Sequence, residues 1–120
     1  MNGSTTLIVD DNEGMRLLAR VLVEEAGGTV VAEAADGDEA VACALEWEPG
    51  VILMDHRMPR SDGVEATGRI KAAHPDATVV AWTSVEDPLA ARRFYDAGAA
   101  EFVVKHDLSA LQRVLRRVCA

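Results

Sequence analysis

Short apolar runs alternate with longer stretches of helical spacing along the whole chain. The runs are rich in β-branched residues and predict strands over residues 5–9, 29–34, 51–54, 77–82 and 101–104. In the stretches that follow them, apolar residues recur every three or four positions, which predicts helices within residues 13–28, 36–50, 61–75, 87–99 and 107–118. Glycine and proline near the ends of these stretches, as in Pro49-Gly50, are typical of helix ends.

This alternation predicts an α/β fold. Parallel strands need crossover connections, which helices provide, and such a sheet carries helices on both faces. The run Val51–Met54 is apolar at every position, as expected of a strand that is covered on both sides. Glu33 interrupts the second run, so that strand is expected nearer an edge. We therefore expect a single doubly wound, flavodoxin-like domain over residues 1–120, with five parallel strands in the order 2-1-3-4-5 and no output domain.

Composition narrows the class of protein. With 49% hydrophobic and 27% charged residues, the 120-residue chain has the balance of a globular domain. The N-terminus lacks the basic segment of a signal peptide, and no stretch approaches the ~20 apolar residues of a membrane span. We therefore expect a cytoplasmic protein that does not bind membranes. Cys43 and Cys119 lie outside any CxxC pattern and are expected to be free thiols.

The net charge of −8 comes from the first half of the chain. Residues 1–60 hold twelve acidic and four basic residues, whereas residues 61–120 hold eight of each. Because phosphate neutralisation supplies most of the affinity for nucleic acids, an acidic domain is a poor binder of them. We expect no direct binding of nucleic acid by this domain.

Polar side chains follow four of the predicted strands. In chain order they are Asp10, Asp11, Asp55, Thr83 and Lys105. In an open α/β sheet the site lies at the carboxyl ends of the strands, and strands one and three are neighbours in the expected order. Three carboxylates should therefore converge, and they would repel one another. A hard cation such as Mg²⁺ removes that conflict.

These residue types together predict a site at which an aspartate is phosphorylated. Aspartate can form an aspartyl phosphate, a known type of covalent intermediate. Lysine supplies a point charge for phosphate, and a hydroxyl supplies a hydrogen bond. Each residue by itself is more often structural, since Asp10 or Asp11 could merely cap the first helix. Asp62-Gly63 is better placed than Asp55 to cap the third.

The motifs together resemble the receiver domain of two-component response regulators, the CheY-like family. The resemblance covers the chain from about Thr6 to Val118 and rests on four motifs in order, LIVDDNE, VILMDHRMPRSDG, VVAWTS and DAGAAEFVVK. The segment KHDLSAL is most similar to receivers of the NarL/LuxR type, which precede helix-turn-helix DNA-binding domains.

The resemblance implies a phosphorylatable signalling switch rather than an enzyme. Asp55 would accept a phosphoryl group from a histidine kinase or a phosphotransfer protein. Asp11 and Asp55 would ligate Mg²⁺ directly, together with the backbone carbonyl of Arg57, and Asp10 would act through water. The only catalytic activities that the resemblance implies are weak self-phosphorylation and self-dephosphorylation.

The resemblance also implies how phosphorylation changes the surface. Lys105 would pair with a phosphate oxygen, and Thr83 would hydrogen-bond the phosphoryl group and move toward it. Phe102 occupies the position of the family's switch aromatic, so the face of the fourth helix, fifth strand and fifth helix would change its partners. The implied partner is an output domain or a downstream protein, with transcription as the expected output. A phosphorylation-dependent homodimer stays open.

Two residues depart from the family pattern. His106 follows Lys105, where many receivers have a proline after a cis bond; a cis bond before a non-proline residue costs about 3 kcal/mol or more, so we expect a trans bond. Trp82 stands where a smaller aliphatic side chain is commoner. We expect it to crowd the path between Thr83 and Phe102.

His56 is the neighbour of Asp55 and a candidate ligand or acid–base group. Successive residues that leave a strand tend to point in opposite directions. If Asp55 faces the site, His56 turns aside, and we expect it to be packed or solvent-facing rather than catalytic.

Three other functions use similar residues. An aspartyl hydrolase or phosphotransferase of the haloacid dehalogenase type has a second Asp two residues after the nucleophile, where this chain has Arg57. A flavodoxin-like cofactor binder has a phosphate loop rich in Ser, Thr or Gly, where this chain has the anionic DDNEG. A receiver-like interaction module that is never phosphorylated would not require the full set of site residues, and it stays open as the alternative.

Overall fold

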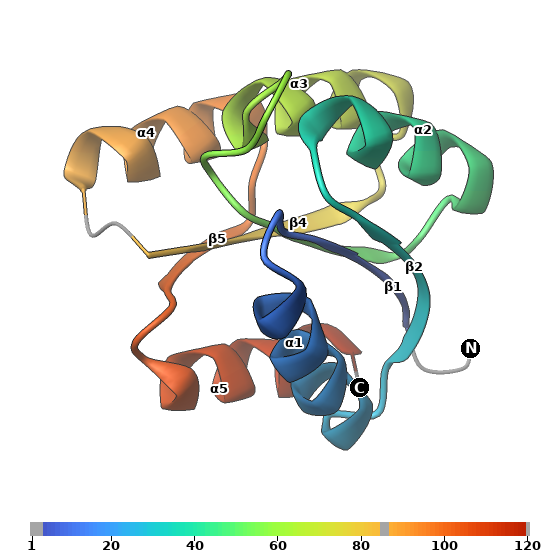
Figure 1. The fold of residues 1–120 in the computed structure, drawn as a ribbon, viewed down its shortest axis with the longest axis vertical. Coiled ribbons are helices and arrows are strands. Elements are labelled where there is room, and N and C mark those ends of the chain that lie inside the picture. Colours follow the sequence, from blue (N-terminus) through green and yellow to red (C-terminus); the bar gives the residue numbers. More distant parts are fainter. Residues whose placement is uncertain (1–3, 85–86, 120) are drawn as a thin grey trace.

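The computed structural model describes residues 4–84 and 87–119, and within them it contains a parallel sheet and five helices (Figure 1). In chain order the elements are β1 (Thr5–Val9), α1 (Glu13–Glu25), β2 (Thr29–Ala34), α2 (Gly37–Trp47), β3 (Val51–Met54), α3 (Gly63–Ala73), β4 (Thr78–Thr83), α4 (Pro88–Ala97), β5 (Glu101–Val104) and α5 (Leu108–Cys119). The alternation predicted from the sequence is confirmed.

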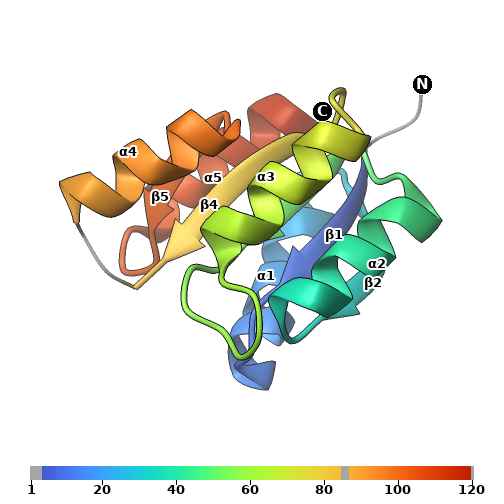
Figure 2. The ribbon, with the colours of Figure 1, turned by 90° about the horizontal axis from the view of Figure 1, so that it is seen from above.

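The sheet has the order β2-β1-β3-β4-β5, and every pair of neighbours is parallel. Helices α1 and α5 cover one face, and α2, α3 and α4 cover the other (Figures 1 and 2). The doubly wound fold class and the strand order are therefore confirmed. As Glu33 indicated, β2 lies at an edge of the sheet.

Two apolar clusters fill the space between the sheet and its helices. Val51 and Leu53 of β3 pack with α1 and α5, whereas Ile52 and Met54 pack with α2, α3 and α4. All four residues of β3 are buried. The central strand is continuously apolar because both of its faces meet helices. This packing fixes where β3 ends, and so where Asp55 lies.

Side-chain caps define where the five helices begin. Asn12, Asp36, Asp62, Asp87 and Asp107 each accept a hydrogen bond from a backbone N–H in the first turn of the helix that follows. The cap expected at Asp62 is confirmed. Because Asn12 caps α1, neither Asp10 nor Asp11 does so. Strand β4 begins and ends one residue later than expected, so Thr83 is its last residue rather than the first one after it.

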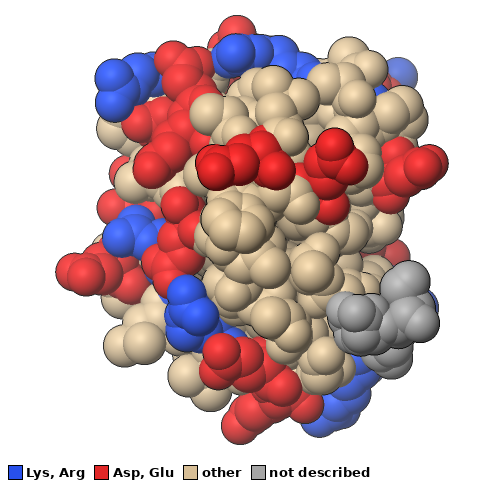
Figure 3. Space-filling view, turned by 90° about the vertical axis from the view of Figure 1, so that its right-hand side faces the viewer, with Lys and Arg blue, Asp and Glu red and all other residues tan. Residues whose placement is uncertain are grey.

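The acidic first half of the chain forms the β2 end of the sheet. Figure 3 shows this end, on which the red Asp and Glu side chains cover more of the surface than the blue Lys and Arg. Within the described residues, no helix is long and apolar enough to cross a membrane.

Candidate functional site

Three carboxylates meet at the carboxyl ends of β1 and β3. The two strands are paired up to Val9 and Met54, and the N–H of Asp55 donates to the carbonyl of Val9 at 2.9 Å. Carboxylate oxygens of Asp10, Asp11 and Asp55 all lie within 4.8 Å of one another. Asp10 and Asp55 are buried, whereas Asp11 is exposed. The expected convergence of these three side chains is present.

Lys105 brings a positive charge to this cluster. Its Nζ lies 2.5 Å from Oδ2 of Asp10 and 3.3 Å from Oδ1 of Asp55. The N–H of Lys105 donates to the carbonyl of Thr83 at 2.6 Å, so the ends of β4 and β5 are joined beside the site. No cis peptide bond occurs among the described residues, which confirms the trans bond between Lys105 and His106.

Among the described carboxyl groups, Asp55 has the most strongly shifted pKa. Burial raises the pKa of Asp55 to about 6, and the negative charge of Asp10 acts in the same direction. Lys105 and the N–H of His56 lower this pKa, but they do not offset the first two effects. A second positive charge at this position would favour the carboxylate form.

The cluster opens onto a cleft of about 360 Å³. The residues that line it include all five of the strand-end residues expected from the sequence, together with Ser84, His56 and Arg57. Thr83 is buried in its wall, with 1% of its surface exposed. Phe102 does not line the cleft. The polar groups that line the cleft thus include carboxylates, one ammonium group and hydroxyls, a combination suited to an anionic group accompanied by a cation.

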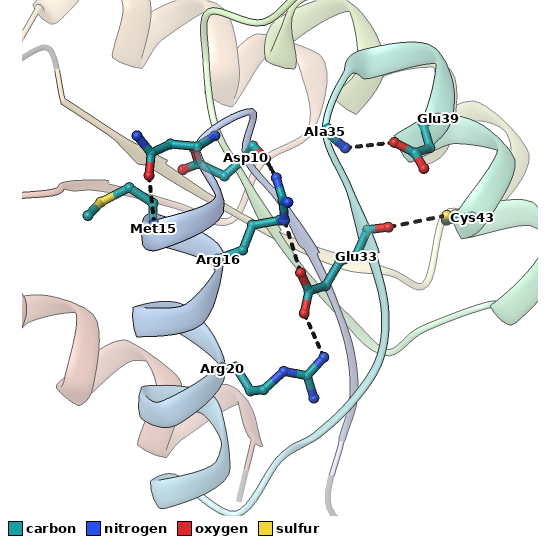
Figure 4. Close-up of polar contacts among 9 residues, drawn as sticks. Asp10, Met15, Arg16, Arg20, Glu33, Ala35, Glu39 and Cys43 are labelled. Atoms are coloured by element: carbon teal, nitrogen blue, oxygen red, sulfur yellow. Dashed lines mark hydrogen bonds and ion pairs between the residues drawn. The ribbon is translucent and has the colours of Figure 1, made fainter.

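Arg16 supports the end of β1 from helix α1 (Figure 4). It donates to the backbone carbonyl of Asp10 at 2.7 Å and to Glu33 of β2 at 2.9 Å. Arg20 donates to the other oxygen of Glu33, and this hydrogen bond is the main cause that holds the pKa of Glu33 below its ordinary value. Sequence reasoning missed Arg16; the i,i+4 pair Arg16 and Arg20, opposite an acidic residue in an edge strand, was the available signal.

Gly63 brings α3 against the backbone of Asp55. Its N–H donates to the carbonyl of His56 at 2.7 Å, and its carbonyl accepts a hydrogen bond from the Thr67 hydroxyl. A Cβ atom at Gly63 would overlap the backbone carbonyl oxygen of Asp55. The loop between β3 and α3 therefore needs a glycine at this position, which sequence reasoning had treated only as part of a helix start.

The rings of His56 and Phe102 both contact Phe94 of α4. The His56 ring meets Phe94 edge-on at a centroid distance of 5.4 Å, and Phe102 lies 5.9 Å from Phe94. His56 Nδ1 is buried and has no hydrogen-bond partner among the described residues. The expectation that His56 packs to one side of the site is confirmed.

Trp82 lies on the opposite face of the sheet from Phe102. It packs in the cluster with α1 and α5, whereas Phe102 packs against the cluster of α2, α3 and α4. The expectation that Trp82 crowds the path between Thr83 and Phe102 is therefore wrong. Successive residues along β4 point to opposite faces of the sheet. Thr83 and Phe102 therefore lie on one face, and Trp82 lies on the other.

The donor set fits a hard divalent cation. Mg²⁺ prefers oxygen ligands and commonly uses one or two carboxylates, leaving positions for water and phosphate. The three clustered carboxylates supply such oxygens, and the raised pKa of Asp55 records the charge conflict that a cation would relieve. Asp10 already uses one oxygen for the N–H of Asn12 and the other for Lys105.

A family model for the response regulator receiver domain matches residues 6–116. The chain belongs to this family. Its relatives include the response regulator GacA of Pseudomonas viridiflava, 40% identical over 100 residues that cover 82% of this chain and 47% of that protein. The chain thus spans about half the length of the curated relatives it matches.

Solved receiver structures agree in fold. A LuxR-family two-component response regulator from Aurantimonas sp. SI85-9A1 superposes with a TM-score of 0.85 at 31% identity, covering 98% of this chain and 89% of that one. CheY in the CheX–CheY–BeF3–Mg complex of Borrelia burgdorferi gives a TM-score of 0.83 at 26% identity, covering 97% and 90%. The resemblance drawn from the sequence motifs is confirmed.

Proposed function

We propose that this receiver domain is a signalling switch that is phosphorylated on Asp55. A carboxylate oxygen of Asp55 attacks the phosphorus of a phosphohistidine on a histidine kinase or a phosphotransfer protein. The new P–O bond forms as the P–N bond breaks, and the histidine nitrogen leaves with the electron pair. Hydrolysis reverses the state: water attacks the phosphorus, the bond to Asp55 breaks, and inorganic phosphate leaves.

The observation that carries this proposal is the position of Asp55. It is a buried carboxylate at the end of a central strand, it has Asp10 and Lys105 beside it, and it lines an open cleft. The negative charge of a purely structural carboxylate would be compensated by its partners, whereas the pKa of Asp55 is raised to about 6. Such a mismatch is characteristic of functional sites.

Asp11, Asp55 and the backbone carbonyl of Arg57 would hold Mg²⁺, with Asp10 acting through water. When bound, the cation supplies the positive charge that lets an anionic carboxylate approach an anionic phosphoryl group. Lys105 then pairs with one phosphoryl oxygen, a role supported by the short distances from its Nζ to Asp10 and Asp55. The hydroxyl of Thr83, at the wall of the cleft, donates to another.

The switch would run from Thr83 to Phe102. Movement of the Thr83 hydroxyl toward the phosphoryl group leaves space that the half-buried Phe102 ring can fill. Because Phe102 and His56 both contact Phe94, helix α4 is packed against both the phosphorylation loop and β5. The surface of α4, β5 and α5 is therefore the face expected to change.

That surface would act on an output domain or a downstream protein. The similarity to a LuxR-family regulator and the relatives' greater length support transcriptional control by a separate output domain. CheY of Borrelia burgdorferi, which was solved in complex with CheX, supports a protein partner for the activated form. A cytoplasmic location and a phosphorylation-dependent homodimer stay predictions.

Incubation with Mg²⁺ and acetyl phosphate, followed by intact mass measurement, tests the proposal. We expect one added phosphoryl group in the wild type and none in Asp55→Asn. Omission of Mg²⁺ should also prevent the adduct. A wild-type chain that gains no phosphoryl group and does not bind beryllofluoride would support the interaction module that is never phosphorylated.

A further inference from the structure

We infer that Trp82 is a positioning residue that holds the ammonium group of Lys105 at the phosphoryl site. The Nζ of Lys105 lies 5.3 Å from the centroid of the Trp82 ring, over its face. The inference rests on the proposed phosphorylation of Asp55 and adds a residue to that site. Trp82 does not line the cleft, so it would act through Lys105 alone.

The register of β4 and β5 places the two side chains together. Trp82 is paired with Val103, and both belong to the apolar cluster under α1 and α5. Lys105 comes two residues after Val103, so its side chain leaves the sheet on the same face. Its Nζ then lies beside Asp10 and Asp55 at the carboxyl edge and over the Trp82 ring.

An aromatic face suits this position because it attracts a cation and accepts none of its conventional hydrogen bonds. The three N–H groups of Lys105 stay available for oxygen atoms, first those of Asp10 and Asp55 and then those of a phosphoryl group. A lysine stem is flexible, and without a platform its ammonium group can turn to solvent. Trp82, with 2% of its surface exposed, is itself held rigidly.

The indole N–H does not explain why a tryptophan stands here. Trp82 Nε1 is buried and has no hydrogen-bond partner among the described residues. A buried, unpaired N–H is a cost that phenylalanine would avoid. The face of the ring, rather than its polar edge, is therefore the useful part, and Trp82→Phe is the variant that keeps it.

Phosphorylation kinetics test this role in three variants. The rate of adduct formation from acetyl phosphate is measured by intact mass over a range of donor concentrations. We expect Trp82→Leu to slow the maximal rate by about 2-fold to 30-fold, the range of a cation–π contact, and Trp82→Phe to restore most of it. Leu111→Ala, which opens a cavity in the same apolar cluster but leaves Trp82 in place, controls for lost packing and should keep the rate.

A double-mutant cycle with Lys105→Met separates positioning from general damage. If Trp82 acts through Lys105, Trp82→Leu should have no further effect on the rate once the ammonium group is gone. The same slowing in both backgrounds, or equal rates for Trp82→Leu and the wild type, would overturn the inference and leave the proposed function intact.

NMR of the lysine side chain gives a readout that needs no phosphorylation. The ring current of Trp82 should shift the ε-methylene protons of Lys105 upfield, and Trp82→Leu should abolish that shift. If the shift is absent from the wild type, Lys105 does not lie on the ring and the inference fails. If the shift is present but the wild type takes up no phosphoryl group, the proposed function fails and the placement of Lys105 stands.

Discussion

The surroundings of Asp55 disfavour the charged form of its carboxyl group. Its carboxylate is buried beside Asp10, and the single ammonium group of Lys105 is shared between the two. The pKa of Asp55 is raised from 3.8 to about 6. At neutral pH Asp55 is therefore ionised in surroundings that disfavour its negative charge. The proposed role of Asp55 as phosphoacceptor and metal ligand would thus be connected to a local loss of stability.

Removing that charge should stabilise the protein at neutral pH. Between pH 4 and 6 the native state keeps a proton on Asp55 that the unfolded chain has lost, so the stability contributed by Asp55 falls as pH rises through this window. We expect Asp55→Asn to raise the free energy of unfolding by about 1–2 kcal/mol at pH 7.5 without divalent cations, and the gain to vanish below about pH 4. Urea unfolding at several pH values measures it.

Asp76→Asn is the matched control, because Asp76 is exposed in the turn before β4. Its effect should stay within about 0.5 kcal/mol at every pH. A gain from Asp55→Asn that is the same at pH 4 and pH 7.5 would contradict the raised pKa of Asp55.

At the scale of elements, the conformation of the loop between β3 and α3 depends on the close approach of the helix to the end of the strand. Gly63 begins α3 directly against the backbone of Asp55, and the cap at Asp62 fixes the direction of the helix. A methyl group added at Gly63 would meet the backbone of Asp55 rather than a flexible side chain. The position of Asp55 is therefore coupled to the packing of a whole helix.

Two glycines of the same helix allow a paired test. Gly63→Ala should destabilise the protein by about 1–3 kcal/mol, because the methyl group must displace the carbonyl of Asp55, and it should slow phosphorylation. Gly68→Ala meets no atom within 4 Å and should stabilise the protein by up to about 1 kcal/mol through helix propensity. Thermal unfolding and adduct formation are measured for both. Gly63→Ala with wild-type stability would show that the loop can move away at no cost.

Element positions followed from the sequence more readily than side-chain contacts did. The strands and helices were predicted because their periodicity is local, and β4 was misplaced by one residue because apolar Ala77 extends its run. The contact of Arg16 with the carbonyl of Asp10 joins a helix face to a strand end, and nothing local encodes that distance. The direction of Trp82 was misjudged because its neighbour Thr83 was considered without the alternation of the strand.

At the scale of the whole molecule, charge and metal binding are linked. The net charge is −8, and three carboxylates are clustered at one end of the sheet. A divalent cation that binds only the native cluster stabilises the fold by mass action. Metal affinity then becomes a property that global unfolding can report.

We expect Mg²⁺ to raise the thermal midpoint of the wild type. At ten times the dissociation constant, the stabilisation is about 1.4 kcal/mol, and a chelator should reverse it. The effect should weaken below about pH 6, where Asp55 becomes protonated. Asp11→Asn is the diagnostic variant, since exposed Asp11 should matter little for stability without metal. An unchanged response to Mg²⁺ in that variant would exclude Asp11 as a ligand.

The sequence by itself determined the alternating elements, the fold class and the residues that reach the site. These follow from local periodicity and from the rule that parallel strands end at one edge of a sheet. Only the tertiary structure decided that Lys105 lies on the face of Trp82, that Gly63 touches the backbone of Asp55, and that His56 packs on Phe94. Those contacts join segments distant in the chain, and their geometry depends on how helices and loops pack together rather than on any local pattern.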